Sequence, residues 1–109
     1  MTEDLFGVCP FVTAQRVLQG KWTILILHAL SEKTMRFNEL QRALPKLTQA
    51  TLTKQLRTME EDGLVMRTVY PQIPPKVEYT LTEMGKKAGP LLKEIENWGG
   101  QYIASLKGE

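Results

Sequence analysis

The sequence predicts a mostly α-helical α+β fold, a winged helix-turn-helix with a two-stranded wing and a long C-terminal helix. Three patterns lead to this prediction. From residue 37 onward apolar residues recur at helical spacings, a stretch rich in Val, Thr and Tyr alternates in polarity, and Pro or Gly ends the predicted helices. The 109 residues suit one domain, so we expect residues 1–109 to form a single winged-helix unit.

Two helices are expected before the helix-turn-helix. Pro10 suits a first helical turn, and a short helix from Val12 to Leu18 should end at Gly20. The segment Lys21–Leu30 is apolar nearly all round, which is typical of a helix buried by its neighbours. We therefore expect it to be the centre of the core, with His28 as a core or interface histidine.

The helix-turn-helix is expected at about residues 37–62. Its first helix, Phe37–Leu44, is followed by a proline, which cannot continue the hydrogen-bond ladder. The second helix should begin after Thr48, a plausible N-cap, and stop at Gly63. Its apolar residues, which form one narrow stripe, are Leu52, Leu56 and Met59. The opposite face of the helix is therefore polar.

The wing is expected at about residues 64–82. Leu64–Tyr70 and Lys76–Thr82 have the composition of strands and flank a proline-rich tip. Because a two-stranded hairpin is marginally stable alone, one of its faces should rest on the helices. The residues expected on that face are Val65, Val69, Val77, Tyr79 and Leu81.

A terminal helix, the predicted dimerisation helix, should occupy about residues 83–107, with Thr82 as its N-cap. Pro90 should kink or split it, and Gly99-Gly100 should weaken it. Its apolar surface exceeds what one end of so small a core can cover, so we expect a partner subunit to cover the remainder, although packing within the chain is an alternative. The predicted interface residues are Phe6, Phe11, Leu91, Leu92, Ile95, Trp98 and Tyr102.

This order of elements carries sequence blocks that together resemble the HxlR-type family of winged helix-turn-helix regulators, which is related to the MarR type. The blocks are Cys9-Pro10, Gly20–Thr23, Arg36–Leu40, Leu52–Leu56, Glu61–Arg67 and Val77–Gly85. The resemblance implies a bacterial transcription regulator: a homodimer that places two recognition helices in successive major grooves of duplex DNA. Two features depart from the family pattern: Ala50, where a longer polar residue is frequent, and Gly99-Gly100 in the terminal helix.

The outward face of the second helix supports DNA binding on physical grounds. This face is polar and cationic through its first three turns and acidic only at Glu60–Asp62, so phosphates meet no carboxylate along those three turns. The free amides near Thr48 and Gln49 also favour a phosphate. Gln49 and Lys54 can reach base edges, Ala50 and Thr51 suit a thymine methyl group, and Arg57 suits a phosphate. A merely solvated face is the alternative.

Further contacts are expected outside that helix. Arg36 either holds the DNA backbone or pairs with Glu39 or Glu78, and Asn38 has the same two options. At the wing tip, Gln72 and Lys76 are placed to meet the minor groove or its phosphates. An ordinary solvated lysine is the alternative for Lys76.

The composition bounds the remaining functions. Apolar residues make up 42% and charged residues 24%, and the net charge of +2 does not by itself indicate a nucleic-acid partner. The longest apolar run, Ile24–Leu27, is far below the roughly 20 residues of a membrane helix, and the acidic residues 1–4 do not resemble a signal peptide. We therefore expect a cytoplasmic protein without membrane contact.

One cysteine, Cys9, and one histidine, His28, leave neither an internal disulfide nor a metal cluster. We expect no metal, no cofactor and no enzyme activity, because Ser and Thr lack a base to activate them. Cys9 stands just before a helix, where a thiol can become reactive, and the family includes members that sense electrophiles or oxidants at this place. A buried packing cysteine is the alternative. The rival function is a winged-helix protein-interaction module, and whether a small-molecule effector binds, and which one, is unknown from the sequence.

Overall fold

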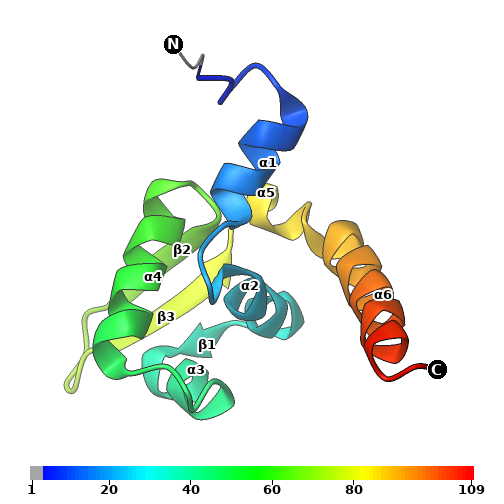
Figure 1. Ribbon diagram of the computed structural model, residues 1–109. Coiled ribbons are helices and arrows are strands. Elements are labelled where there is room, and N and C mark those ends of the chain that lie inside the picture. Colours follow the sequence, from blue (N-terminus) through cyan, green and yellow to red (C-terminus); the bar gives the residue numbers. More distant parts are fainter. Residues whose placement is uncertain (1–3) are drawn as a thin grey trace.

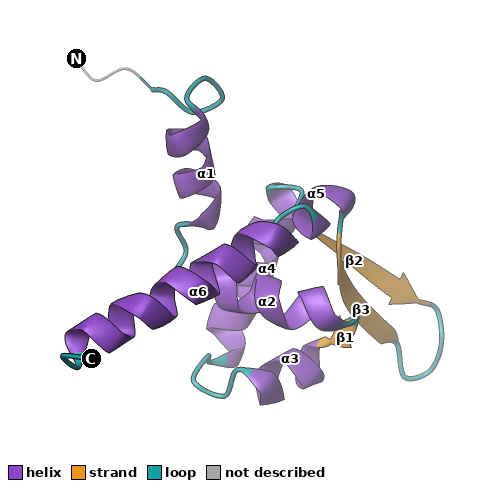
Figure 2. Cartoon of the chain, turned by 90° about the vertical axis from the view of Figure 1, so that its right-hand side faces the viewer, coloured by secondary structure: helices purple, strands orange, loops and turns teal. Residues whose placement is uncertain are grey.

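The computed structural model describes residues 4–109, so the first three residues of the acidic start lie outside the described residues. Helices cover one side of a small sheet, and the first helix and the end of the last helix extend from the body (Figures 1 and 2). No helix among residues 4–109 is long and apolar enough to span a bilayer. The elements are α1 (Pro10–Leu18), α2 (Thr23–Glu32), β1 (Met35–Arg36), α3 (Phe37–Ala43), α4 (Gln49–Glu61), β2 (Val65–Tyr70), β3 (Lys76–Leu81), α5 (Glu83–Lys86) and α6 (Gly89–Leu106).

The predicted fold class, a winged helix-turn-helix, is confirmed. α3 and α4 form the helix-turn-helix, and β2 and β3 form an antiparallel wing whose register runs from Val65 opposite Leu81 to Tyr70 opposite Lys76. The sequence did not predict β1, which pairs antiparallel with β3 and makes a three-stranded sheet of order β1-β3-β2. Two residues are too few to show an alternating pattern.

The wing packs on the helices at its base, as predicted for most of its inward residues. Val65, Tyr79 and Leu81 are buried. Val69 is 51% exposed, so the prediction that it rests on the helices is wrong. Val69 lies only one pair from the end of the ladder, where the strands extend toward the tip.

The core joins α2, α3, α4 and the sheet. Leu27 of α2, Leu40 of α3 and Leu56 of α4 are almost completely buried within it. The prediction that α2 is buried all round is wrong, because Leu25 is 45% exposed. His28 is also exposed and lies 3.9 Å from Glu32 (Nε2 to Oε1), so it is not a core histidine.

Local signals set the ends of α4 as predicted. The Thr48 hydroxyl accepts a hydrogen bond from the backbone N–H of Thr51 (3.1 Å), which caps the helix. Gly63 has a φ of +76°, the left-handed conformation that glycine adopts without strain. The chain then turns directly into the wing.

Thr82 is the N-cap of α5, as predicted, and its hydroxyl also links α5 to the start of the wing. Its hydroxyl accepts from Gly85 N (3.0 Å) and donates to the carbonyl oxygen of Gly63 (2.5 Å). A Cβ at Gly85 would lie 2.2 Å from the carbonyl oxygen of Leu64. The glycine therefore permits α5 to approach the start of the wing closely.

Pro90 splits the terminal helix as predicted, since α5 ends at Lys86 and α6 begins at Gly89 with Pro90 in its first turn. α6 continues as a helix through Gly99-Gly100. Its C-terminal half extends from the rest of the chain (Figure 2), and only Leu92 among its residues is buried. Most of the apolar surface of α6 is thus uncovered in the single chain.

Candidate nucleic-acid interface

The predicted recognition residues lie together on the outward face of α4. This helix lies on the left of the molecule in Figure 1, on the side opposite α6. Leu52, Leu56 and Met59 fix its orientation because they are buried in the core. A shallow surface groove on the outward side is lined by Gln49, Ala50, Thr53, Lys54 and Arg57.

The N-terminal end of α4 carries unpaired backbone donors. Thr48 and Thr51 are already engaged, because their hydroxyls lie 2.9 Å apart and Thr48 caps the N–H of Thr51. The N–H groups of Gln49 and Ala50 precede the first intrahelical bond, which Leu52 N makes to the oxygen of Thr48. The helix end therefore presents two amides to an anion, and Thr48 shapes the end as its cap.

Arg36 stands at the N-cap of α3, where its backbone N–H donates to Glu39 Oε1 (2.9 Å). This bond lowers the pKa of the Glu39 carboxyl from its ordinary value. The predicted carboxylate partners of Arg36 are both taken by lysines: Glu39 by Lys33 (3.9 Å) and Glu78 by Lys76 (3.5 Å). Within residues 4–109 the Arg36 guanidinium makes no ion pair, and its contact with the DNA backbone stays a prediction.

Asn38 is exposed on the first turn of α3. No hydrogen bond of its side chain is found within the described part of the chain. Its predicted contact with DNA stays a prediction.

Lys76 differs from the projecting cation expected at the wing. Its ammonium lies 3.5 Å from Glu78 Oε2 and 4.8 Å from the centre of the Tyr70 ring, and its side chain is 28% exposed. A hydrogen bond to the same carboxylate raises the pKa of the Tyr70 phenol. The charge of Lys76 is thus partly neutralised against the strands, while Gln72 stays exposed at the tip.

Arg67 joins this surface, although the sequence reasoning assigned it no contact. It lies opposite Tyr79 in the wing, and both line a groove of about 370 Å³ with residues of α4, namely Thr53, Leu56, Arg57 and Glu60. The alternation of the strand carried a signal for this residue, because Arg67 occupies the same face of the strand as buried Val65. A charged residue at a position that faces the helices could have identified Arg67 as a candidate site residue.

A second surface, formed by α1 and α6, is apolar and uncovered. Phe11 is 86% exposed, Trp98 65% and Tyr102 54%, and the rings of the last two lie 5.5 Å apart. Phe6 and Leu91 are exposed and Ile95 is half-buried. Leu92, predicted at the interface, is 8% exposed and packs in the chain's own core. It therefore has little surface left for a partner.

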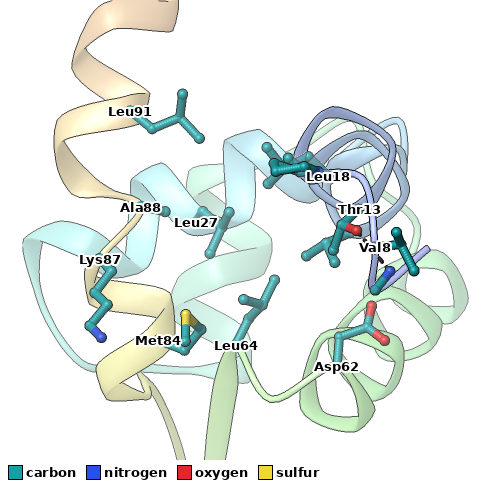
Figure 3. A pocket seen from close by; sticks show the side chains of 14 residues that line it. Val8, Thr13, Leu18, Leu27, Asp62, Leu64, Met84, Lys87, Ala88 and Leu91 are labelled. Carbon is teal, nitrogen blue, oxygen red and sulfur yellow. Dashed lines mark hydrogen bonds between the residues drawn. The ribbon is translucent and has the colours of Figure 1, made fainter. Parts of the chain in front are cut away.

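A hollow of about 550 Å³ adjoins this surface between α1, the end of α4 and the start of α6. Figure 3 shows Leu18, Leu27 and Leu91 around it, with Lys87 and Asp62 on opposite sides. Val8 and Pro10, the neighbours of Cys9, also line it. The hollow is therefore largely apolar and continuous with the exposed face of α1.

Cys9 is half-buried at the N-cap of α1. Its backbone N–H donates to Leu5 O (2.8 Å), and its carbonyl oxygen accepts from the Thr13 hydroxyl (2.8 Å), which in turn accepts from Gly7 N (2.8 Å). These bonds hold the turn that carries the thiol. No group of three or more metal-ligating side chains is found from residue 4 to residue 109.

Comparison with known proteins agrees with this architecture. The family model described as HxlR-like helix-turn-helix matches residues 17–107. An uncharacterized HTH-type transcriptional regulator of Bacillus subtilis, YdeP, is 44% identical over 101 residues, which cover 93% of this chain and 79% of that protein.

Two solved structures are similar over nearly the whole chain. The redox regulator HypR in its reduced form superposes with a TM-score of 0.86 at 40% identity, covering 93% of this chain and 100% of that one, and an oxidized form of HypR has also been solved. A putative MarR-family regulator from Porphyromonas gingivalis superposes with a TM-score of 0.81 at 34% identity, covering 91% and 95%. These relatives share both the sequence pattern and the fold.

Proposed function

The chain belongs to the HxlR-like helix-turn-helix family, and we propose that this transcriptional regulator binds specific sites on duplex DNA as a homodimer. The observation that carries the proposal is the outward face of α4. It presents Lys54 and Arg57 to solvent, whereas its carboxylates begin only at Glu60. Such a surface attracts phosphates and can enter a major groove by its N-terminal end.

Each residue of this face has a distinct proposed role. The amides of Gln49 and Ala50 meet a phosphate, while the Gln49 side chain pairs with adenine and Lys54 with guanine. Ala50 and the Thr51 methyl group pack on a thymine methyl. Arg57 and Arg67, which line one groove, hold a phosphate between the recognition helix and the wing. Arg36 and Asn38 contact the adjoining backbone.

The homodimer is proposed to form through α1 and α6. Exposed aromatic side chains on both helices need cover from water, and a second copy of the same surface provides it. The hollow beside α1 is open to receive side chains of the partner. Pairing through α1 and α6 leaves both α4 helices free to contact DNA. A dimeric helix-turn-helix protein binds two half-sites about 34–36 Å apart.

We further propose that Cys9 senses electrophiles or oxidants. HypR is described as a redox regulator with reduced and oxidized forms, and Cys9 lies at the N-terminal end of α1, beside the proposed interface. The Cys9 thiol would lose its proton and add through sulfur to a ring carbon of a quinone, and the proton would pass to a quinone oxygen, which gives a hydroquinone thioether. Alternatively, two Cys9 thiols would give two electrons and two protons to diamide, which becomes the hydrazine as the disulfide forms. Either change alters how the subunits sit.

The rival proposal is a protein-interaction module. An apolar or acidic outward face on α4 would favour it, and this face is neither. The regulator acts in the cytoplasm, where its DNA is, and catalyses no reaction under this proposal.

The decisive experiment is selection of bound fragments from random duplex DNA, followed by footprinting. We expect a two-fold symmetric site with two protected half-sites one helical turn apart. Recovery of no enriched sequence, with no retention of duplex DNA, would leave the protein-interaction module as the better account.

A further inference from the structure

The turn between α1 and α2 lies beside α4, the proposed recognition helix (Figure 1). Thr23, the first residue of α2, is 4% exposed, and no other Ser, Thr, amide or charged residue between residues 4 and 109 is buried. Its hydroxyl donates to Oε1 of Gln55 in α4 (3.2 Å). A hydroxyl away from water is costly without a partner, so this bond ties α2 to α4.

Gly20 lets the turn come close enough for the bond to form. A Cβ at residue 20 would lie 2.3 Å from Thr23 Oγ1 and 2.9 Å from Gln55 Oε1. The carbonyl oxygen of Gly20 also accepts from Thr23 N (3.2 Å), which closes the turn that leads into α2. Position 20 therefore has no room for a side chain while Thr23 and Gln55 are bonded.

The bond restrains α4 in a way that its apolar contacts do not. The buried leucines of α4 hold it in the core, but the hydrophobic effect is non-directional. A hydrogen bond has a preferred distance and angle. Between residues 4 and 109 no other side-chain hydrogen bond joins α4 to another helix. Gln55 stands next to Lys54 and two residues before Arg57, so a rotation of α4 that the bond prevents would move both cations.

We propose that Thr23 and Gln55 are positioning residues that fix the orientation of α4, and with it the separation between the two α4 helices of a dimer. This inference rests on the proposed DNA-binding function. Neither side chain is assigned a contact with DNA, because Thr23 is buried and the amide of half-buried Gln55 is turned toward α2. Helices held in one orientation meet half-sites at one separation, whereas helices free to rotate accept neighbouring separations with lower affinity.

The test compares the affinities of the intact protein for three duplexes, read by fluorescence anisotropy. One duplex carries the half-sites recovered by selection at their natural separation, and the others have it lengthened or shortened by one base pair. Wild type should strongly prefer the natural separation. Thr23→Val removes the hydroxyl but keeps the shape of the side chain. It should weaken binding to the natural duplex at least about fivefold, the effect of one hydrogen bond, and reduce the preference by a similar factor.

Further variants separate positioning from a general loss of structure, which would lower the affinity for all three duplexes equally. Thr23→Ser keeps the hydroxyl and should keep the preference for the natural separation. Gly20→Ala retains both partners but crowds their bond, so it should reproduce Thr23→Val. Thr34→Val is the matched control, because the Thr34 hydroxyl bonds to that of Thr80 (3.1 Å), outside α4.

A double-variant cycle identifies the bond itself as the cause. Gln55→Met removes the amide at nearly constant length. The variant that combines Thr23→Val with Gln55→Met should bind no worse than Gln55→Met alone, because both changes remove one shared bond. Effects that add would mean that the two residues act separately, which overturns the positioning role.

The remaining outcomes distinguish this role from the function on which it rests. A Thr23→Val variant that keeps the wild-type affinity within twofold, or loses affinity equally for the three duplexes, overturns the positioning role while DNA binding stands. A wild type that binds no duplex overturns the proposed function together with this inference. A wild type that binds all three separations equally overturns the inference and the proposed pairing of two half-sites.

Discussion

Lys54 and Arg57 provide the most direct test of the recognition surface. Both are exposed on α4, and neither makes an ion pair within residues 4–109. Replacing either with alanine should thus leave the free energy of unfolding within about 0.5 kcal/mol of wild type. Each lost contact costs at least about 1 kcal/mol of DNA binding. Two subunits double this to about 2 kcal/mol, a fall of about 30-fold in affinity.

The assay is a DNA titration at several salt concentrations, paired with thermal unfolding of the free protein. Wild-type affinity should fall steeply with salt, and removing one phosphate contact in each subunit should reduce the slope by about 2. Lys107→Ala is the control, because Lys107 lies at the end of the chain opposite α4 (Figure 1). Unchanged affinity in both α4 variants would refute the recognition-helix assignment, and a flat salt response would favour protein interaction.

Three other expectations follow from the same structure. Sedimentation at micromolar concentration should show a dimer. Trp98→Ala should shift it toward monomer or an unfolded chain, because Trp98 is 65% exposed in the single chain and is expected to be covered by the partner. A native wild-type monomer would contradict the proposed interface. Diamide or a quinone should change the DNA affinity of the wild type, whereas Cys9→Ser should bind normally and ignore the reagent; modified Cys9 with unaltered affinity would make the thiol a packing residue. Gly85→Ala should lower the free energy of unfolding by about 1–3 kcal/mol, since its Cβ would lie 2.2 Å from the carbonyl oxygen of Leu64. Urea unfolding measures this change. A midpoint equal to that of the wild type would show that the backbone shifts there without cost.

Most helices and the wing were predictable from the sequence because their signals are local. Thr48 caps α4 and Gly63 ends it through groups no more than a few residues away. Pro90 splits the terminal helix by the same kind of local restriction. The stripe of Leu52 and Leu56 also determined which face of α4 is outward, so the candidate recognition residues could be identified before the structure.

Contacts between distant segments decided the rest. β1 exists only because β3 offers it a hydrogen-bonding edge, and two residues carry no periodic signal. Arg67 reaches the groove of Arg57 because β2 packs along α4, and Lys76 turns to Glu78 because the two residues share one face of β3. None of these neighbours follows from spacing alone.

The sequence by itself determined the order of the helices and of the two wing strands, the ends of α4 and the cationic outward face of α4, because capping, proline restriction and apolar periodicity act within a few residues. Only the tertiary structure decided which apolar residues the chain covers for itself. Leu92 is buried while Leu91 beside it is exposed, and His28 lies outside although its helix is largely apolar. Burial depends on what packs against a residue from elsewhere in the chain, and a linear pattern does not contain that information.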